Sequence, residues 1–176
     1  MLFAWAYQPR QFDQALLHRR VAAHWPRVRA TCAAHSRPLP PVPLRQWVLS
    51  LPKMLRYALA YEGKLCRAVA KTAMQELFRF QRLQARRARG LGSTKQAHTG
   101  AMVAVQRFGS ALNLNIHFHA LVLAGVFMVD AFGHPVFMER APPSLGDLHR
   151  VTGRIAEAVL ALLRRRHIWL DDLDEN

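Results

Sequence analysis

Two histidines, His117 and His119, are the side chains of this sequence whose type and spacing are best suited to chemistry. They bracket one bulky apolar residue, Phe118. On an extended strand, side chains at i and i+2 project from one face, about 6.6 Å apart along the backbone. Two imidazoles at that spacing can tilt toward one cation, which makes the pair a candidate metal half-site. The spacing also fits two half-buried histidines that are hydrogen-bonded to their neighbours, so both interpretations stay open.

A strand must carry this pair, because apolar and polar side chains alternate around it with a period of two. One face, which we expect to be buried, holds Leu114, Ile116, Phe118, Ala120 and Val122. The other face holds Asn113, Asn115, His117 and His119, followed by Leu121 and Leu123. A slip of one residue would bury all four polar side chains, so the register should be well fixed. The polar face needs hydrogen-bonding partners, and we expect a polar group to meet it.

Two blocks in this order resemble the rolling-circle transposases of the insertion-sequence-91 family, the two-tyrosine type. They are VQRFGSALNLNIHFH at residues 105–119 and LRQWVLSLP at residues 44–52. The resemblance covers about residues 42–170. In that family the histidine–hydrophobic–histidine triplet, called the HUH motif, holds a divalent metal. The metal polarises the scissile phosphate of single-stranded DNA while a downstream tyrosine attacks it.

The resemblance implies that His117 and His119 are metal ligands and that single-stranded DNA at transposon ends is the partner. A hairpin between residues 100–108 and the histidine strand would place Gln106 near the pair, where its amide oxygen completes the metal shell. Asp130 and Glu139 are alternative third ligands. Mixed oxygen and nitrogen ligands suit Mg²⁺ or Mn²⁺, although two imidazoles also suit Zn²⁺.

The charge of the chain also points to a polyanionic partner. The formal net charge is +14, and residues 1–98 hold 18 Lys and Arg against 3 Asp and Glu, whereas residues 99–176 hold 7 against 8. Nucleic acid is the leading partner, ahead of an anionic membrane surface. Five arginines crowd the end of a predicted helix, more than capping of a helix dipole requires, and a solvated face is the alternative to phosphate contact. The predicted DNA-binding residues are Arg82, Arg86, Arg87 and Arg89 from this helix, and Arg45, Arg107, Asn113 and Asn115 from the two blocks.

The pattern predicts an α+β fold, with a small antiparallel sheet and helices packed on one of its faces; in family terms this is an incomplete ferredoxin-like HUH nuclease fold. We expect strands over residues 45–51, 100–108, 113–123, 126–129 and 136–138, and helices over 54–61, 64–89 and 144–167. Gly63 suits a C-terminal cap of the first helix, and Ser144, with Asp147 three residues on, suits an N-terminal cap of the third. We expect residues 1–43 to form a poorly defined segment that contains a helix over 11–34 and a proline-rich linker. Residues 44–170 should form the N-terminal part of the nuclease domain, and residues 171–176 a disordered acidic tail.

Two family features are missing from this sequence. The family carries a cysteine-rich zinc module upstream, whereas Cys32 and His35 make at most half of a site. The family's nucleophilic tyrosines follow the histidines, whereas Tyr7, Tyr57 and Tyr61 all precede them. The spacing of Tyr57 and Tyr61 mimics a tyrosine pair, but packing on an amphipathic helix explains it more simply. We therefore expect a truncated transposase fragment that keeps the metal half-site and is inactive in strand cleavage.

The main alternative is a non-catalytic, basic nucleic-acid-binding module whose histidines are structural. An amidohydrolase barrel needs a longer chain, and a cupin would be nearly all strand. Two cysteines are too few for a disulfide framework, and the uncharged span 108–129 carries too many polar groups to cross a membrane. We expect a protein of the bacterial cytoplasm, associated with the nucleoid.

Overall fold

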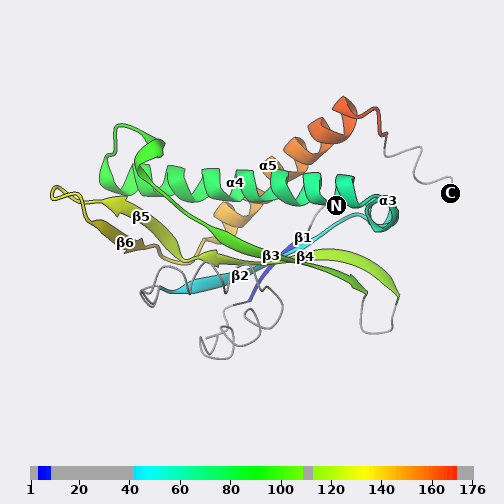
Figure 1. The fold of residues 1–176 in the computed structure, drawn as a ribbon, viewed down its shortest axis with the longest axis horizontal. Coiled ribbons are helices and arrows are strands. Elements are labelled where there is room, and N and C mark those ends of the chain that lie inside the picture. The colour runs from blue at the N-terminus through cyan, green and yellow to red at the C-terminus, as the bar shows by residue number, and fades with distance from the viewer. Residues whose placement is uncertain (1–3, 9–41, 109–112, 170–176) are drawn as a thin grey trace, which may run out of the picture.

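The computed structural model describes residues 4–8, 42–108 and 113–169. Six strands, three α-helices and one short 3₁₀ helix make up this part of the chain (Figure 1). In chain order they are β1 (Ala4–Gln8), β2 (Leu44–Ser50), α3 (Lys53–Tyr61), α4 (Gly63–Arg89), η1 (Thr94–Gln96), β3 (Ala101–Phe108), β4 (Leu114–Leu123), β5 (Gly125–Val129), β6 (Pro135–Glu139) and α5 (Leu145–Arg165). The predicted α+β class is confirmed.

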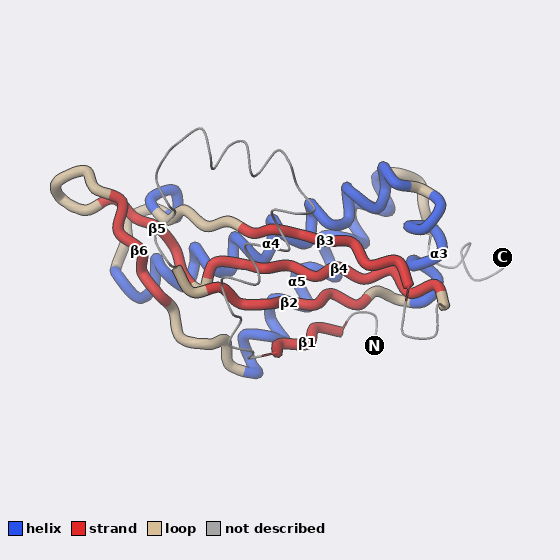
Figure 2. Tube along the Cα trace, turned by 60° about the horizontal axis from the view of Figure 1, so that its bottom comes forward, coloured by secondary structure: helices blue, strands red, loops and turns tan. Residues whose placement is uncertain are grey.

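The main sheet has four antiparallel strands in the order β1-β2-β4-β3. The histidine strand β4 therefore lies inside the sheet, between β2 and β3. The three α-helices lie on one side of this sheet, as Figure 2 shows, where the strands lie in front and the helices behind. β1 lies within residues 1–43, where the sequence pattern predicts no strand.

The expected alternation of β4 is confirmed. Ile116, Phe118, Ala120 and Val122 are at most 1% exposed and pack in the main core. Their partners in this core come from β2 and from the three helices, and include Trp47, Leu49, Leu55, Leu65, Leu77, Ile155 and Val159. Because successive side chains of a strand point to opposite faces, His117 and His119 lie on the face turned away from the helices.

The long helix α4 buries a stripe with spacings of three and four residues, which contains Leu65, Val69, Ala73 and Leu77. It ends at Gly90, which has φ 62° and ψ 28°, a left-handed conformation that glycine adopts readily. The prediction that Gly63 caps the preceding helix is wrong. Glu62 separates the two helices as the last cap of α3 and the first cap of α4, and Gly63 is already helical.

Helix α5 begins with the expected N-terminal cap. The Ser144 hydroxyl accepts a hydrogen bond from the Asp147 backbone N–H, and the Asp147 carboxylate accepts one from the Ser144 backbone N–H. This reciprocal capping box fixes the start of the helix. Its stripe of Val151, Ile155 and Val159 then packs into the main core.

Strands β5 and β6 form a separate two-stranded hairpin (Figure 1). A small second core of Ala85, Ala97 and Val126 joins this hairpin to the end of α4. Gly125 is required where the hairpin begins, because a Cβ there would lie 1.9 Å from the Met138 carbonyl oxygen.

Several expected elements fall outside the described residues: the helix over 11–34, most of the proline-rich linker, Cys32 and His35, the turn at 109–112, and the acidic tail. Among the helices that the structure describes, none is both long enough and apolar enough to span a membrane.

Candidate metal and nucleic-acid site

The register of the sheet defines which side chains surround the histidines. His117 lies opposite Ser50 of β2 and Gln106 of β3, whereas His119 lies opposite Val48 and Ala104. Directly opposed residues of neighbouring strands share a face. The histidine pair therefore lies on an inner strand, on the sheet face that carries no helix within the described residues.

The two imidazole rings lie side by side. Their centroids are 4.8 Å apart and the ring planes are inclined by 59°. Nδ1 of His117 lies 2.7 Å from the backbone carbonyl oxygen of Asn115. Because a carbonyl oxygen only accepts, this Nδ1 carries the proton, and Nε2 of the neutral ring keeps its lone pair. A metal-binding histidine commonly has this arrangement, in which the second nitrogen donates to an oxygen.

His119 is oriented by Gln46 of β2, whose side-chain nitrogen Nε2 lies 3.0 Å from Nδ1 of the ring. In this orientation the amide donates to Nδ1, and the proton of the neutral ring lies on Nε2. Nε2 is buried and has no hydrogen-bond partner among the residues that the structure describes. A buried donor without a partner is unfavourable.

Rotating the Gln46 amide by half a turn exchanges its oxygen and nitrogen, two atoms that are nearly identical in shape. The amide oxygen then accepts from Nδ1–H, and the lone pair moves to Nε2 of His119. Both histidines then carry an Nε2 lone pair on the same sheet face. With the Gln46 amide rotated, the unpartnered Nε2 of His119 has a lone pair that can bind a cation. In the orientation of the structure, the same atom carries a proton, which would repel a cation.

The surroundings of His119 keep its ring neutral. Burial, and secondarily the nearby His117, lower the pKa of His119 below its ordinary value of 6.5. Neutral imidazole is the form that binds metal, so no proton has to be removed from this ring at neutral pH.

Gln106, the predicted third ligand, is exposed and opposite His117, and its side-chain nitrogen donates to the Phe108 carbonyl oxygen at 3.0 Å. Its amide oxygen as a ligand stays a prediction. The structure does not bring Asp130 or Glu139, the alternative third ligands, to the histidine pair, because no group of three His, Cys, Asp or Glu residues that could hold a metal occurs in the described ranges. Asp130 instead accepts from the backbone N–H groups of Phe132 and His134 and stabilises the β5–β6 turn.

The described residues offer two nitrogen donors at this point of the sheet. A structural zinc site is normally closed by four protein ligands, which the described residues do not supply around the pair. Mg²⁺ and Mn²⁺ are commonly held by few protein ligands and fill the remaining positions with water and phosphate oxygens. Two imidazoles match Zn²⁺ in donor type, whereas Mg²⁺ or Mn²⁺ would draw oxygen ligands from water and phosphate.

The structure does not bring the predicted arginines to the histidine face. Arg45 is on the helix-covered face of β2 with Trp47, and its guanidinium donates to the carbonyl oxygens of Arg140 and Ala141. Arg107 donates to the carbonyl oxygen of Ala60, near the end of α3, at 3.2 Å.

The predicted arginines of α4 belong to the helical layer (Figure 1). Arg82 donates to the carbonyl oxygen of Phe78, and Arg86 donates to that of Leu91 just after the helix. Arg87 and Arg89 are exposed. Asn115 faces the same side as the histidines, and Asn113 is exposed directly before β4.

Tyr57 and Tyr61 lie on α3, which packs on the opposite side of the sheet from the histidines. Tyr57 is 49% exposed and Tyr61 is 87% exposed. The structure therefore does not bring either hydroxyl to the metal candidates, and the exposure of Tyr61 does not agree with the predicted packing on an amphipathic helix.

Gln46 is the site residue that sequence reasoning missed. Its role depends on β2 lying beside β4, and two helices separate these strands in the sequence. The sequence feature that could have indicated this role is the polar side chain of Gln46, which directly precedes the buried Trp47 in a strand that is otherwise mostly apolar.

Comparison with known proteins supports one functional class. The family model Y2_Tnp, described as "Putative transposase", matches residues 100–143. This range contains β3, the histidine strand and the β5–β6 hairpin. No curated protein and no solved structure matches the chain. The family match supports a role related to DNA transposition.

Proposed function

We propose that this chain is an HUH-type transposase segment of the insertion-sequence-91 kind, which binds single-stranded DNA at transposon ends and holds Mg²⁺ or Mn²⁺ between His117 and His119. One observation carries the proposal: two neighbouring imidazoles share the sheet face that bears no helix among the described residues, where the buried Nε2 of His119 also lacks a described hydrogen-bond partner. The transposase family match includes the strand that bears both residues.

Each residue of the site has a separate task in this proposal. His117, fixed by the Asn115 carbonyl, and His119, fixed by Gln46, present their Nε2 atoms to the cation. When bound, the cation acts as a Lewis acid toward a phosphate oxygen of the DNA. Polar side chains on the same face, from Asn115, Ser50 and Gln106, are available to the nucleotide beside it.

The proposal assigns binding, and not strand cleavage, to the described part of the chain. A tyrosine oxygen that attacks phosphorus must reach the phosphate held at the metal. Tyr57 and Tyr61 lie on the helical side of the sheet, so neither hydroxyl takes this role. Cleavage then requires a nucleophile other than Tyr57 and Tyr61.

Calorimetric titration with Mn²⁺ tests the metal proposal. We expect the parent protein to bind one Mn²⁺ ion and His117→Ala/His119→Ala to bind none. His98→Ala/His149→Ala is a matched control, because it removes two exposed imidazoles from other parts of the fold. Circular dichroism establishes that each variant is folded. A parent that binds no Mn²⁺, or a folded His117→Ala/His119→Ala that binds it equally well, would refute the metal site.

A second candidate is a nucleic-acid-binding module with structural histidines. The orientation of the Gln46 amide favours it, because an N–H donated to Nδ1 keeps the proton of His119 on Nε2. Imidazole ¹⁵N NMR separates the two candidates. The metal proposal predicts that Mg²⁺ moves the His119 proton from Nε2 to Nδ1, whereas the module predicts the same Nε2–H tautomer with and without Mg²⁺. The module should also keep its full DNA affinity in chelator.

A further inference from the structure

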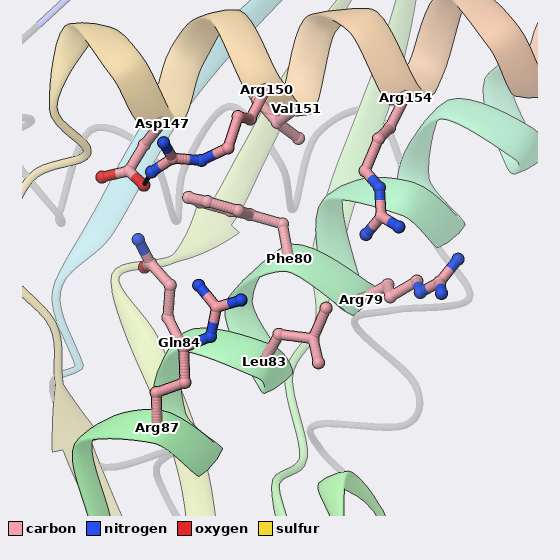
Figure 3. Close-up of a pocket in the computed structure, with 9 residues that line it drawn as sticks. All are labelled: Arg79, Phe80, Leu83, Gln84, Arg87, Asp147, Arg150, Val151 and Arg154. Atoms are coloured by element: carbon pink, nitrogen blue, oxygen red, sulfur yellow. Dashed lines mark hydrogen bonds and ion pairs between the residues drawn. The ribbon is translucent and has the colours of Figure 1, made fainter.

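A groove between α4 and α5 gathers arginines from two separate parts of the chain. Arg79 and Arg87 line it from α4, and Arg150 and Arg154 line it from α5 (Figure 3). Its volume is about 340 Å³, and Phe80 projects into it between the two helices. The groove belongs to the helical layer, on the other side of the sheet from the histidines.

Few acidic groups offset these four guanidinium groups. Arg150 forms a 2.6 Å ion pair with Asp147, and Arg79 lies 3.8 Å from Glu76. Arg87 and Arg154 have no acidic partner within the described residues. The Asp147 carboxylate is already occupied by the Ser144 backbone, the Ser144 hydroxyl and Arg150, so it offers little to the other arginines.

The arrangement resembles an anion site more than a solvated surface. In Figure 3 the Arg87 side chain extends from α4 into the groove, and Arg154 extends from α5 toward α4. Like charges that face each other across two packed helices repel, and an anion between them would relieve that repulsion. Guanidinium groups match phosphate oxygens in geometry as well as in charge. Phe80 adds an aromatic surface of the kind on which a nucleotide base can stack.

We propose that the α4–α5 groove binds the sugar–phosphate backbone of DNA, as a second contact surface separate from the histidine face. The identity of the anion as DNA rests on the proposed transposase function, whereas the groove itself is independent of the metal pair. A nucleic acid strand that contacts both surfaces has to pass around an edge of the sheet.

DNA binding measured in chelator isolates this groove from the metal site. The probe is a fluorescently labelled single-stranded oligonucleotide, and its affinity is measured by anisotropy over a range of salt concentrations. The test variant is Arg87→Glu/Arg154→Glu. The control is Arg67→Glu/Lys71→Glu, which makes the same change in net charge at two exposed positions of α4 outside the groove.

We expect the groove variant to bind at least about 10-fold more weakly than the control. Because two phosphate contacts are lost, the slope of log K against log salt should fall by about 1.4 for a single strand. Arg87→Ala/Arg154→Ala should show the same order of effect with less disturbance of the fold. If the groove and control variants lose affinity equally, or if the parent does not bind DNA, the proposal is overturned.

Two further arms identify the ligand and separate this proposal from the metal site. The loss of affinity in the groove variant should be the same in Mn²⁺ and in chelator; a loss seen only with Mn²⁺ would overturn the groove as an independent site. A duplex of equal length should also be sensitive to the groove variant, since both forms share the phosphate backbone. Competition by millimolar inorganic phosphate that matches competition by the oligonucleotide would show a free-phosphate site and contradict the DNA assignment.

Discussion

The side-chain nitrogen of Gln46 lies 3.0 Å from Nδ1 of His119, across the pairing of β2 with β4. The two residues are diagonal neighbours, because Gln46 is directly opposite Leu121 and His119 is opposite Val48. This contact determines which nitrogen of His119 carries the proton, and hence whether its Nε2 is available to a cation.

Replacing Gln46 with alanine should weaken Mn²⁺ binding without unfolding the protein. Outer partners of metal-binding histidines typically contribute about 10- to 100-fold in metal affinity, and we expect an effect in this range. Calorimetry measures the affinity, and ¹⁵N NMR of the imidazoles shows whether the His119 tautomer becomes mixed.

Gln106→Ala is the matched comparison for Gln46→Ala, since it truncates the same side-chain type on the opposite neighbour of β4. If Gln106 is a ligand, as the sequence suggests, its replacement will weaken Mn²⁺ binding as well. A Gln46→Ala variant with unchanged affinity and an unchanged tautomer would contradict the positioning role.

Gln81 is the one buried polar side chain of the described core, and its replacement by leucine should destabilise the fold. Its nitrogen donates to the Leu123 carbonyl oxygen at 2.7 Å, and its oxygen accepts from the Thr99 hydroxyl at 2.6 Å. Leucine would remove the donor to the Leu123 carbonyl and leave the Thr99 hydroxyl with only a 3.4 Å bond to the Gly125 carbonyl oxygen, so we expect a loss of about 1–3 kcal/mol in the free energy of unfolding. Chemical denaturation should show little change for Gln75→Leu, an exposed position on the same helix.

Two glycine substitutions should have opposite effects on stability. Gly125→Ala places a Cβ against the Met138 backbone, which must shift, so we expect a loss of about 1–3 kcal/mol and disruption of the β5–β6 hairpin. Gly153→Ala meets nothing within 4 Å in the middle of α5, and should gain about 0.5–1 kcal/mol. Thermal unfolding of both variants tests the pair, and a gain from Gly125→Ala would contradict the packing described for the hairpin.

Asp147→Asn should make the free energy of unfolding depend less on pH in the acid range. Burial alone would raise the pKa of Asp147, but hydrogen bonds from Ser144 and Arg150, with the charge of Arg150, hold that pKa below its ordinary value of 3.8. Because the folded pKa is depressed, the contribution of the carboxylate is present above pH 3.8 and is lost as the pH falls through the folded pKa. The variant should be less stable by about 1 kcal/mol at neutral pH, as expected for a helix cap.

Denaturation at several pH values checks this expectation. The difference between parent and Asp147→Asn should shrink in acid. Glu157→Gln on the exposed side of the same helix should stay within about 0.5 kcal/mol of the parent at neutral pH. A constant difference across the whole pH range would show that the charge of Asp147 contributes nothing to the cap.

Local patterns predicted the elements of this fold well. The alternation around Phe118 gave the buried face of β4, and the spacing of Leu65, Val69 and Leu77 gave the buried face of α4. The Ser144 cap followed from residue types three positions apart. Each of these features belongs to a single helix or strand, so the residues close to it in the sequence are sufficient to predict it.

Relations between distant elements were harder to predict. Arg45 reads as a DNA contact because it is basic and lies in a family block, but tertiary structure gives its guanidinium two backbone carbonyls as partners. Gln46 and the arginines of α5 gain their surroundings only when β2 meets β4 and α5 meets α4. Strand order and helix packing decide such contacts, and the hydrophobic period does not encode them.

The strand order β1-β2-β4-β3 also has a consequence for how the protein folds. β3 and β4 are adjacent in the sequence, whereas β2 reaches β4 across two helices and β1 is more distant still. Strand pairings between segments that are distant in the sequence have a larger entropic cost of loop closure, and they generally form later. The hairpin that contains His117 and His119 is therefore expected to form early, and Gln46 arrives only when β2 docks. During folding, the two imidazoles are side by side before the residue that sets the proton position of one of them is in place.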